Sequence, residues 1–182
     1  MPLQNIFKKQ RELMEKYSKI EMGVTSHDVP VVLNSREGQT RLRQFAWFFT
    51  EEIAEAIAAE GTPTFHEELI DALHFLVELS ILSDLTPKDV TPNQGVLPLS
   101  NSFNTHVTQV IGSIGYAINA LKAKPWKQSW KETDSQDYKL RVIHAFHSFL
   151  EMLEFCGLPI ENLEEHYSMK NSTNHQRIAS GY

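Results

Sequence analysis

The sequence contains little cysteine and no long apolar segment, and both absences narrow its class. Its 182 residues include a single cysteine, Cys156, so neither a disulfide framework nor a cysteine-rich zinc site is expected. No run of 18 or more apolar residues occurs, which argues against a transmembrane helix. Residues 1–10 lack the apolar stretch of a signal peptide. We therefore expect a cytoplasmic protein without a membrane partner.

Positive charge is absent from one part of the chain. No lysine or arginine lies between Arg43 and Lys88, and this stretch contains nine acidic residues. The stretch carries a charge of −9 within a protein of net charge −6, so the remainder carries +3. The net acidity argues against nucleic acid as a partner. The acidity belongs to one segment, which needs its own explanation.

The spacing of the apolar residues along the chain is mainly that of α-helices. Apolar residues recur at spacings of three and four, which predicts helices over about 3–21, 38–60, 63–84, 103–123 and 134–156. A shorter sixth helix is expected to begin near Pro159. Gly61 and Gly157 are expected to end two of these helices, and Pro63 to stand in a first turn. Residues 31–33 form a brief β-like run, too isolated to build a sheet.

The helix over 63–84 is apolar on nearly every side, which predicts a central, buried position. Its sequence also aligns with the helix over 134–156, so that Asp71 matches His144 and His74 matches His147. We expect one all-α domain over residues 1–182, a helical bundle built from a duplicated helix pair with a long crossover at 86–102. Chance similarity between two amphipathic helices is the alternative to duplication.

Four carboxylates stand in two pairs within the acidic segment. Glu52 and Glu55 are three residues apart, as are Glu68 and Asp71, so each pair lies on one helical face. The turn between the two helices is short, which makes them antiparallel neighbours and lets the pairs converge. Such a cluster needs a cation, and oxygen ligands suit Mg²⁺ or Mn²⁺. The alternative, a solvated acidic face, suits the first helix better than the second.

The last 13 residues contain positive and amide side chains, among them Lys170, Asn174 and Arg177. These are donors that could bind the outer phosphates of a nucleotide at a metal site. A frayed chain end is the alternative for this segment.

These residues together resemble the all-α nucleotide pyrophosphatase superfamily, which includes dimeric dUTPases, phage dCTPase-type enzymes and MazG-like proteins. The shared pattern is E-x-x-E followed by E-x-x-D-x-x-H-F, here Glu52, Glu55, Glu68, Asp71, His74 and Phe75. The end of the chain is similar to an element of the dimeric dUTPase branch, in Tyr167, Lys170, Asn171, Asn174, Arg177, Gly181 and Tyr182. Gln10 and Leu13 resemble a base-contacting element of that family.

The resemblance implies a Mg²⁺-dependent homodimer that hydrolyses dUTP to dUMP and diphosphate, with Mn²⁺ as a substitute ion. It implies that the metal ligands, one of which orients the attacking water, are Glu52, Glu55, Glu68 and Asp71. The phosphates would be bound by Lys170, Asn174, Arg177 and Tyr182. The base and sugar would be framed by Gln10, His74 and Phe75.

Three departures from the family pattern leave the base open. Met14 stands where the pattern has Asn, and Ile178 stands where it has Gln. A Trp-Lys-rich loop, expected soon after E-x-x-E, occurs here at 126–131 instead. A dCTPase-like or broader nucleotide pyrophosphatase is therefore the second hypothesis. A catalytically silent scaffold or regulator of the same fold is the third.

Overall fold

The computed structural model describes residues 3–20, 29–98, 100–124, 126–129 and 131–181. These residues form seven α-helices and no strand, which confirms the predicted all-α class. In chain order the helices are α1 (Gln4–Ile20), α2 (Arg36–Ala59), α3 (Phe65–Leu82), α4 (Pro87–Val90), α5 (Phe103–Ala120), α6 (Ser135–Phe155) and α7 (Leu163–Ala179).

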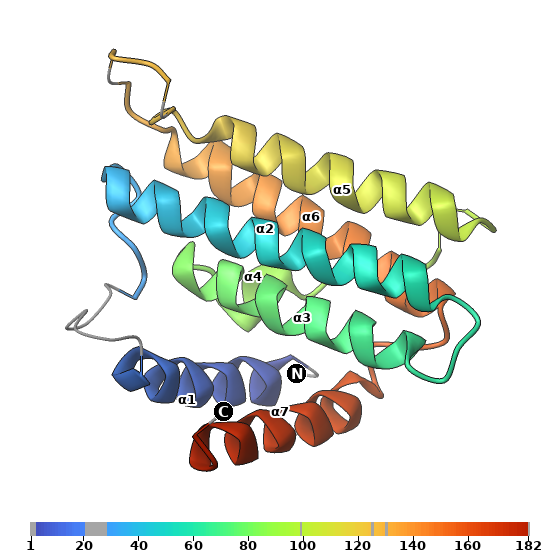
Figure 1. Ribbon diagram of the computed structural model, residues 1–182. Helices are drawn as coiled ribbons and strands as arrows, with labels where there is room; N and C mark the ends of the chain where they lie inside the picture. The colour runs from blue at the N-terminus through green and yellow to red at the C-terminus, as the bar shows by residue number, and fades with distance from the viewer. Residues whose placement is uncertain (1–2, 21–28, 99, 125, 130, 182) are drawn as a thin grey trace.

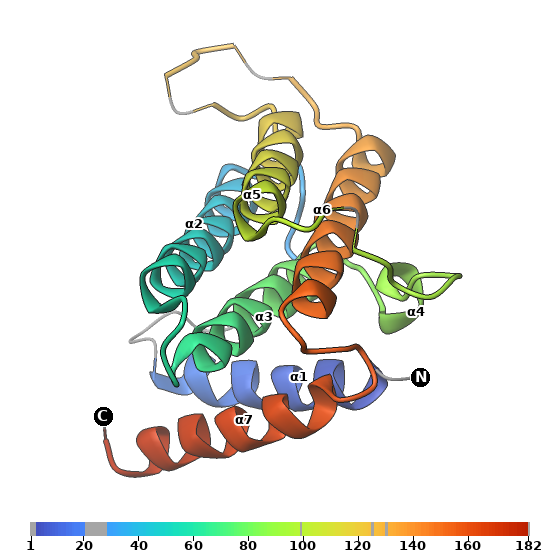
Figure 2. The same cartoon turned by 90° about the vertical axis from the view of Figure 1, so that its right-hand side faces the viewer.

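Four long helices form a bundle of two antiparallel pairs. α2 packs along α3, and α5 packs along α6, as Figure 1 shows. The second view looks nearly along these helices and shows the four together, with α1 and α7 as a further layer against α3 (Figure 2). The two pairs have the arrangement expected of a duplicated helix pair.

The position of α3 between this layer and the bundle explains its composition. Twelve of its 18 residues are buried, and these include His74 and Glu78. The prediction that this helix is central is therefore confirmed. Its apolar side chains belong to one continuous hydrophobic core that also includes residues from α1, α2, α5, α6 and α7.

Local signals explain where several helices begin and end. The Ser35 hydroxyl accepts from the N–H of Gly38 at the start of α2, and the Asp134 carboxylate accepts from two N–H groups at the start of α6. Gly61 and Gly157 have φ values of 79° and 82° just after α2 and α6. Glycine adopts this left-handed conformation readily, so both predicted helix ends are confirmed.

Other boundaries differ from the predictions. α3 begins at Phe65, so Pro63 precedes the helix instead of standing in its first turn. The last helix begins at Leu163 and continues to Ala179, so most of the polar chain end is helical and not frayed. The short α4 was not predicted, although Thr86 and Asp89 form a capping box at its start.

Two loops contain residues singled out in the sequence. Residues 31–33 form no strand, and the N–H of Val31 donates to the carbonyl of Leu82. In the connection between α5 and α6 the side chain of Trp126 is 76% exposed, whereas Trp130 lies outside the described residues.

Among the described helices, none combines the length and apolar character that crossing a membrane requires.

Candidate functional site

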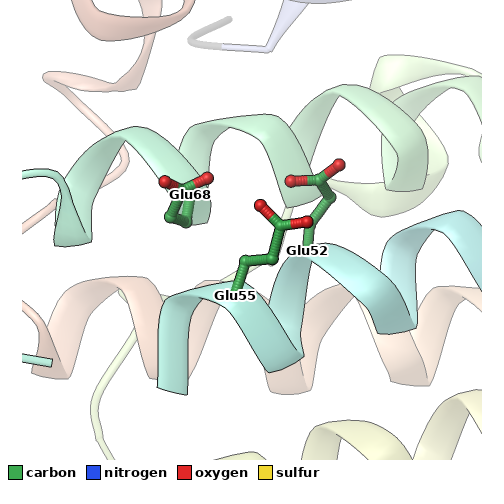
Figure 3. A group of neighbouring side chains, drawn as sticks. All are labelled: Glu52, Glu55 and Glu68. Carbon is green, nitrogen blue, oxygen red and sulfur yellow. The ribbon is translucent and has the colours of Figure 1, made fainter. Parts of the chain in front are cut away.

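Three glutamates face one another across the α2–α3 pair. Glu52 and Glu55 extend from α2 toward Glu68 on α3, as the close-up in Figure 3 shows. One carboxylate oxygen from each residue lies within 4.8 Å of the others. Among the described residues no hydrogen bond or ion pair joins these three carboxylates to a positive side chain. We call them the acidic cluster.

Asp71 is the fourth predicted carboxylate, and it has a different partner. It lies on α3 one turn after Glu68, and its carboxylate oxygen is 2.5 Å from the Nζ of Lys170 on α7. Both side chains are largely buried, at 18% and 17% exposure. Lys170 is thus already placed beside the carboxylates, on a helix that reaches them from the far side of α3.

The electrostatics of the acidic cluster favour protonation or a bound cation. Burial, together with the neighbouring carboxylates of Asp71, Glu55 and Glu68, raises the pKa of Glu52 to about 7. Burial and nearby carboxylates also raise the pKa of Glu68. Burial raises the pKa of Asp71 too, against the opposing effect of Lys170. Like charges held this close need a positive partner if all are to ionise at neutral pH.

A cavity of about 340 Å³ opens beside the acidic cluster, and Glu52 and Asp71 form part of its wall. Its size is within the usual range for a small-molecule pocket. It collects side chains from α1, α2, α3 and α7. The predicted site residues in its wall are Gln10, Glu52, Asp71, His74, Phe75, Asn174 and Arg177.

One side of this cavity is aromatic. The ring of Phe75 lies 5.3 Å from that of Phe48 and 6.3 Å from that of Phe45, centroid to centroid. All three residues line the cavity. A planar aromatic ligand such as a nucleobase would find stacking surfaces here, while Glu52 and Asp71 lie at another part of the same wall.

Buried polar groups form another part of the wall. The Gln10 amide on α1 donates to Glu78 and contacts His74, both on α3, and it accepts from the Tyr167 hydroxyl on α7. Burial lowers the pKa of His74 to about 3, so its imidazole is neutral at physiological pH. The wall therefore offers fixed hydrogen-bonding groups without a positive charge at this histidine.

Two predicted phosphate-binding residues are not found in the cavity wall. Lys170 pairs with Asp71 and lines a neighbouring hollow between α3 and α7. Tyr182 lies outside the described residues. The structure thus brings most of the predicted site residues together, and the ion pair with Asp71 joins Lys170 to this group.

Sequence reasoning missed four residues of the cavity wall, namely Tyr17, Phe45, Phe48 and Glu78. Helical spacing could have found all four of them. Phe45 and Phe48 precede Glu52 by seven and four residues, so they lie on its face of α2. Tyr17 follows Gln10 by seven residues on α1, and Glu78 is one turn beyond His74.

Comparison with known proteins settles the family. A family model described as dUTPase matches residues 2–182, nearly the whole chain. The chain belongs to the dUTPase family. Searches among curated proteins and among solved structures find no match.

Membership of the dUTPase family makes this protein a hydrolase of nucleoside triphosphate anhydride bonds. Enzymes of this type commonly use a divalent metal. The acidic cluster fits such an ion, because three carboxylate oxygens converge and burial disfavours the charged form of Glu52. The dUTPase family and the geometry agree on the kind of chemistry.

The raised pKa of Glu52 predicts how stability depends on pH without metal. An acid with a raised pKa in the folded state stabilises the fold fully below its unfolded pKa, here about 4.5. That contribution is lost as pH rises to about 7. We expect Glu52→Gln to remove this part of the decline, measured by urea unfolding in EDTA between pH 4.5 and 8.

Glu51→Gln is the matched control, because Glu51 is exposed and its carboxylate accepts from Trp47 outside the cluster. It should preserve the decline seen in the unaltered protein. An identical pH profile for Glu52→Gln and the unaltered protein would contradict the electrostatic account of the cluster.

Proposed function

We propose that the protein hydrolyses dUTP to dUMP and diphosphate in a Mg²⁺-dependent reaction, with Mn²⁺ able to substitute. One observation supports this proposal more strongly than any other. Glu52 belongs both to the acidic cluster and to the wall of the aromatic cavity, so a metal-bound phosphate and a stacked base can be parts of one ligand.

The metal ligands in this proposal are Glu52, Glu55 and Glu68, and Asp71 completes the set from the adjacent turn of α3. When bound, the ion would neutralise phosphate charge and lower the pKa of a coordinated water. Lys170 would then be drawn from Asp71 toward the phosphates. The pairing of these two residues keeps the lysine in place before the substrate arrives.

Side chains of the protein would orient the remaining parts of the substrate. Asn174 and Arg177 on α7 line the cavity near Asp71 and would bind phosphate oxygens together with Lys170 and Tyr182. His74, Phe75 and Gln10 would hold the base and sugar. The water oxygen would bond to the α-phosphorus, and diphosphate would leave with the oxygen that bridged the α- and β-phosphorus atoms. A carboxylate of the cluster would accept the proton of the water.

Substrate choice is tested by measuring diphosphate release from each dNTP and NTP in the presence of Mg²⁺. We expect dUTP to have the highest kcat/KM and EDTA to abolish release. Hydrolysis of dCTP without hydrolysis of dUTP would favour the dCTPase-like alternative. Absence of release from every nucleotide would favour a catalytically silent protein of the same fold.

The acidic cluster is tested by Glu68→Gln, which removes a ligand charge while changing little volume. Loss of metal stabilisation worth several kcal/mol predicts a fall in kcat of about a hundredfold or more. Glu67→Gln is the control, because Glu67 is an exposed neighbour outside the cluster. Thermal melting should show that both variants remain folded. Full activity of Glu68→Gln would refute the assignment of this carboxylate.

We also propose that the protein is a homodimer acting on free nucleotides. Large apolar side chains are exposed on three helices of the bundle, at Trp47, Tyr116 and Leu140, and contact with a second copy would cover them. Light scattering should give about twice the 20.9 kDa mass of one chain. A monomer mass across a tenfold concentration range would exclude the homodimer.

A further inference from the structure

The side chain of Gln10 is held by three partners from two other helices. Its Nε2 donates to the Glu78 carboxylate over 2.7 Å, and its Oε1 is 3.0 Å from the Nδ1 of His74. The Tyr167 hydroxyl donates to the same Oε1. All four side chains are buried, and Gln10 is only 2% exposed.

The chemistry of these partners determines the direction of every hydrogen bond. The amide NH₂ of Gln10 donates to the Glu78 carboxylate, so the amide oxygen faces the other two residues. Because an amide oxygen only accepts, Nδ1 of His74 must carry the proton. A neutral imidazole has one N–H, so Nε2 of His74 has a free lone pair.

Tyr167 fixes the imidazole a second time through its ring. The rings of Tyr167 and His74 are stacked, with centroids 3.9 Å apart and planes inclined by 16°. Tyr167 therefore restrains both the plane of the imidazole and the amide that selects its tautomer. A single residue of α7 thus couples α1 to α3 at the wall of the cavity.

The Nε2 of His74 has no hydrogen-bond partner among the described residues and is shielded from solvent. Buried polar atoms are normally paired, and an unpaired one is costly. The imidazole belongs to the cavity wall. A ligand N–H that reached this nitrogen from the cavity would satisfy the acceptor.

We propose that Tyr167 and Glu78 are positioning residues that set base selectivity: they orient Gln10 and so keep Nε2 of His74 as an acceptor for a ring N–H of the substrate's pyrimidine. This proposal rests on the proposed function, since it concerns the base of the same nucleotide. Uracil has a hydrogen on ring nitrogen N3, whereas the N3 of cytosine has a lone pair that would face the lone pair of His74. A site built around a hydrogen bond rejects a ligand that cannot form it.

The tautomer can be measured without any assay of activity. In protein labelled with ¹⁵N-histidine, two-bond correlations at neutral pH should show a protonated Nδ1 and an unprotonated Nε2 for His74. His74→Asn identifies the signals among the eight histidines. Adding dUMP should move the Nε2 signal of His74, and adding dCMP should not. A protonated Nε2, or a signal that dUMP leaves unchanged, would overturn the proposal.

Two variants test the role of the positioning residues in selectivity. Tyr167→Phe keeps the stacked ring but removes the hydroxyl, and Glu78→Gln lets the facing amide turn over. In each we expect the ratio of kcat/KM for dUTP over dCTP to fall about tenfold, the effect of one hydrogen bond. The change should arise mainly in KM, because the acidic cluster is unaltered.

Tyr116→Phe and Glu151→Gln are the matched controls. Tyr116 is exposed on α5, and Glu151 is the residue of α6 that corresponds to Glu78. Both controls should keep the ratio of the unaltered protein. If Tyr167→Phe and Glu78→Gln keep it as well, positioning by these residues is refuted. If the unaltered protein hydrolyses no dNTP, the proposed function fails, and the ¹⁵N titration with dUMP and dCMP still decides the inference.

Discussion

Repulsion among the carboxylates of Glu52, Glu55 and Glu68 is the interaction around which this protein is organised. One oxygen of each lies within 4.8 Å of the others, and the partial burial of Glu52 and Glu68 weakens the screening that water would provide. An isolated pair of helices would relieve this repulsion by separating. The close packing of α2 on α3 prevents that, because the apolar faces of both helices belong to the common core. Hydrophobic burial thus maintains a charge arrangement that favours a cation.

The layer formed by α1 and α7 supplies what the bundle lacks. α7 brings Lys170 to Asp71, and α1 brings Gln10 to Glu78. Both contacts are made on α3, which faces this layer with one side and α2 with another (Figure 2). The cavity is therefore a junction of the two layers, with charge at one part of its wall and aromatic and amide groups at others.

The second helix pair shows what the same architecture does without the acidic cluster. Arg141 of α6 corresponds to Glu68 and pairs with Asp137 one turn away at 2.9 Å, so its charge is compensated locally. His144 corresponds to Asp71 and hydrogen-bonds with Ser113 of α5. Here neighbouring side chains satisfy one another within the pair. In the first pair the charges require a partner from α7 or from a ligand.

Helix positions and the acidic pairs follow from the sequence alone, because both depend on spacing within one helix. The periodicity of apolar residues placed six helices, and the three-residue spacing put Glu52 beside Glu55 and Glu68 beside Asp71. Only the tertiary structure decided that Asp71 pairs with Lys170, and that Gln10 meets Glu78 across 68 residues of sequence. Such contacts depend on which helix faces lie together, and local spacing carries no information on that.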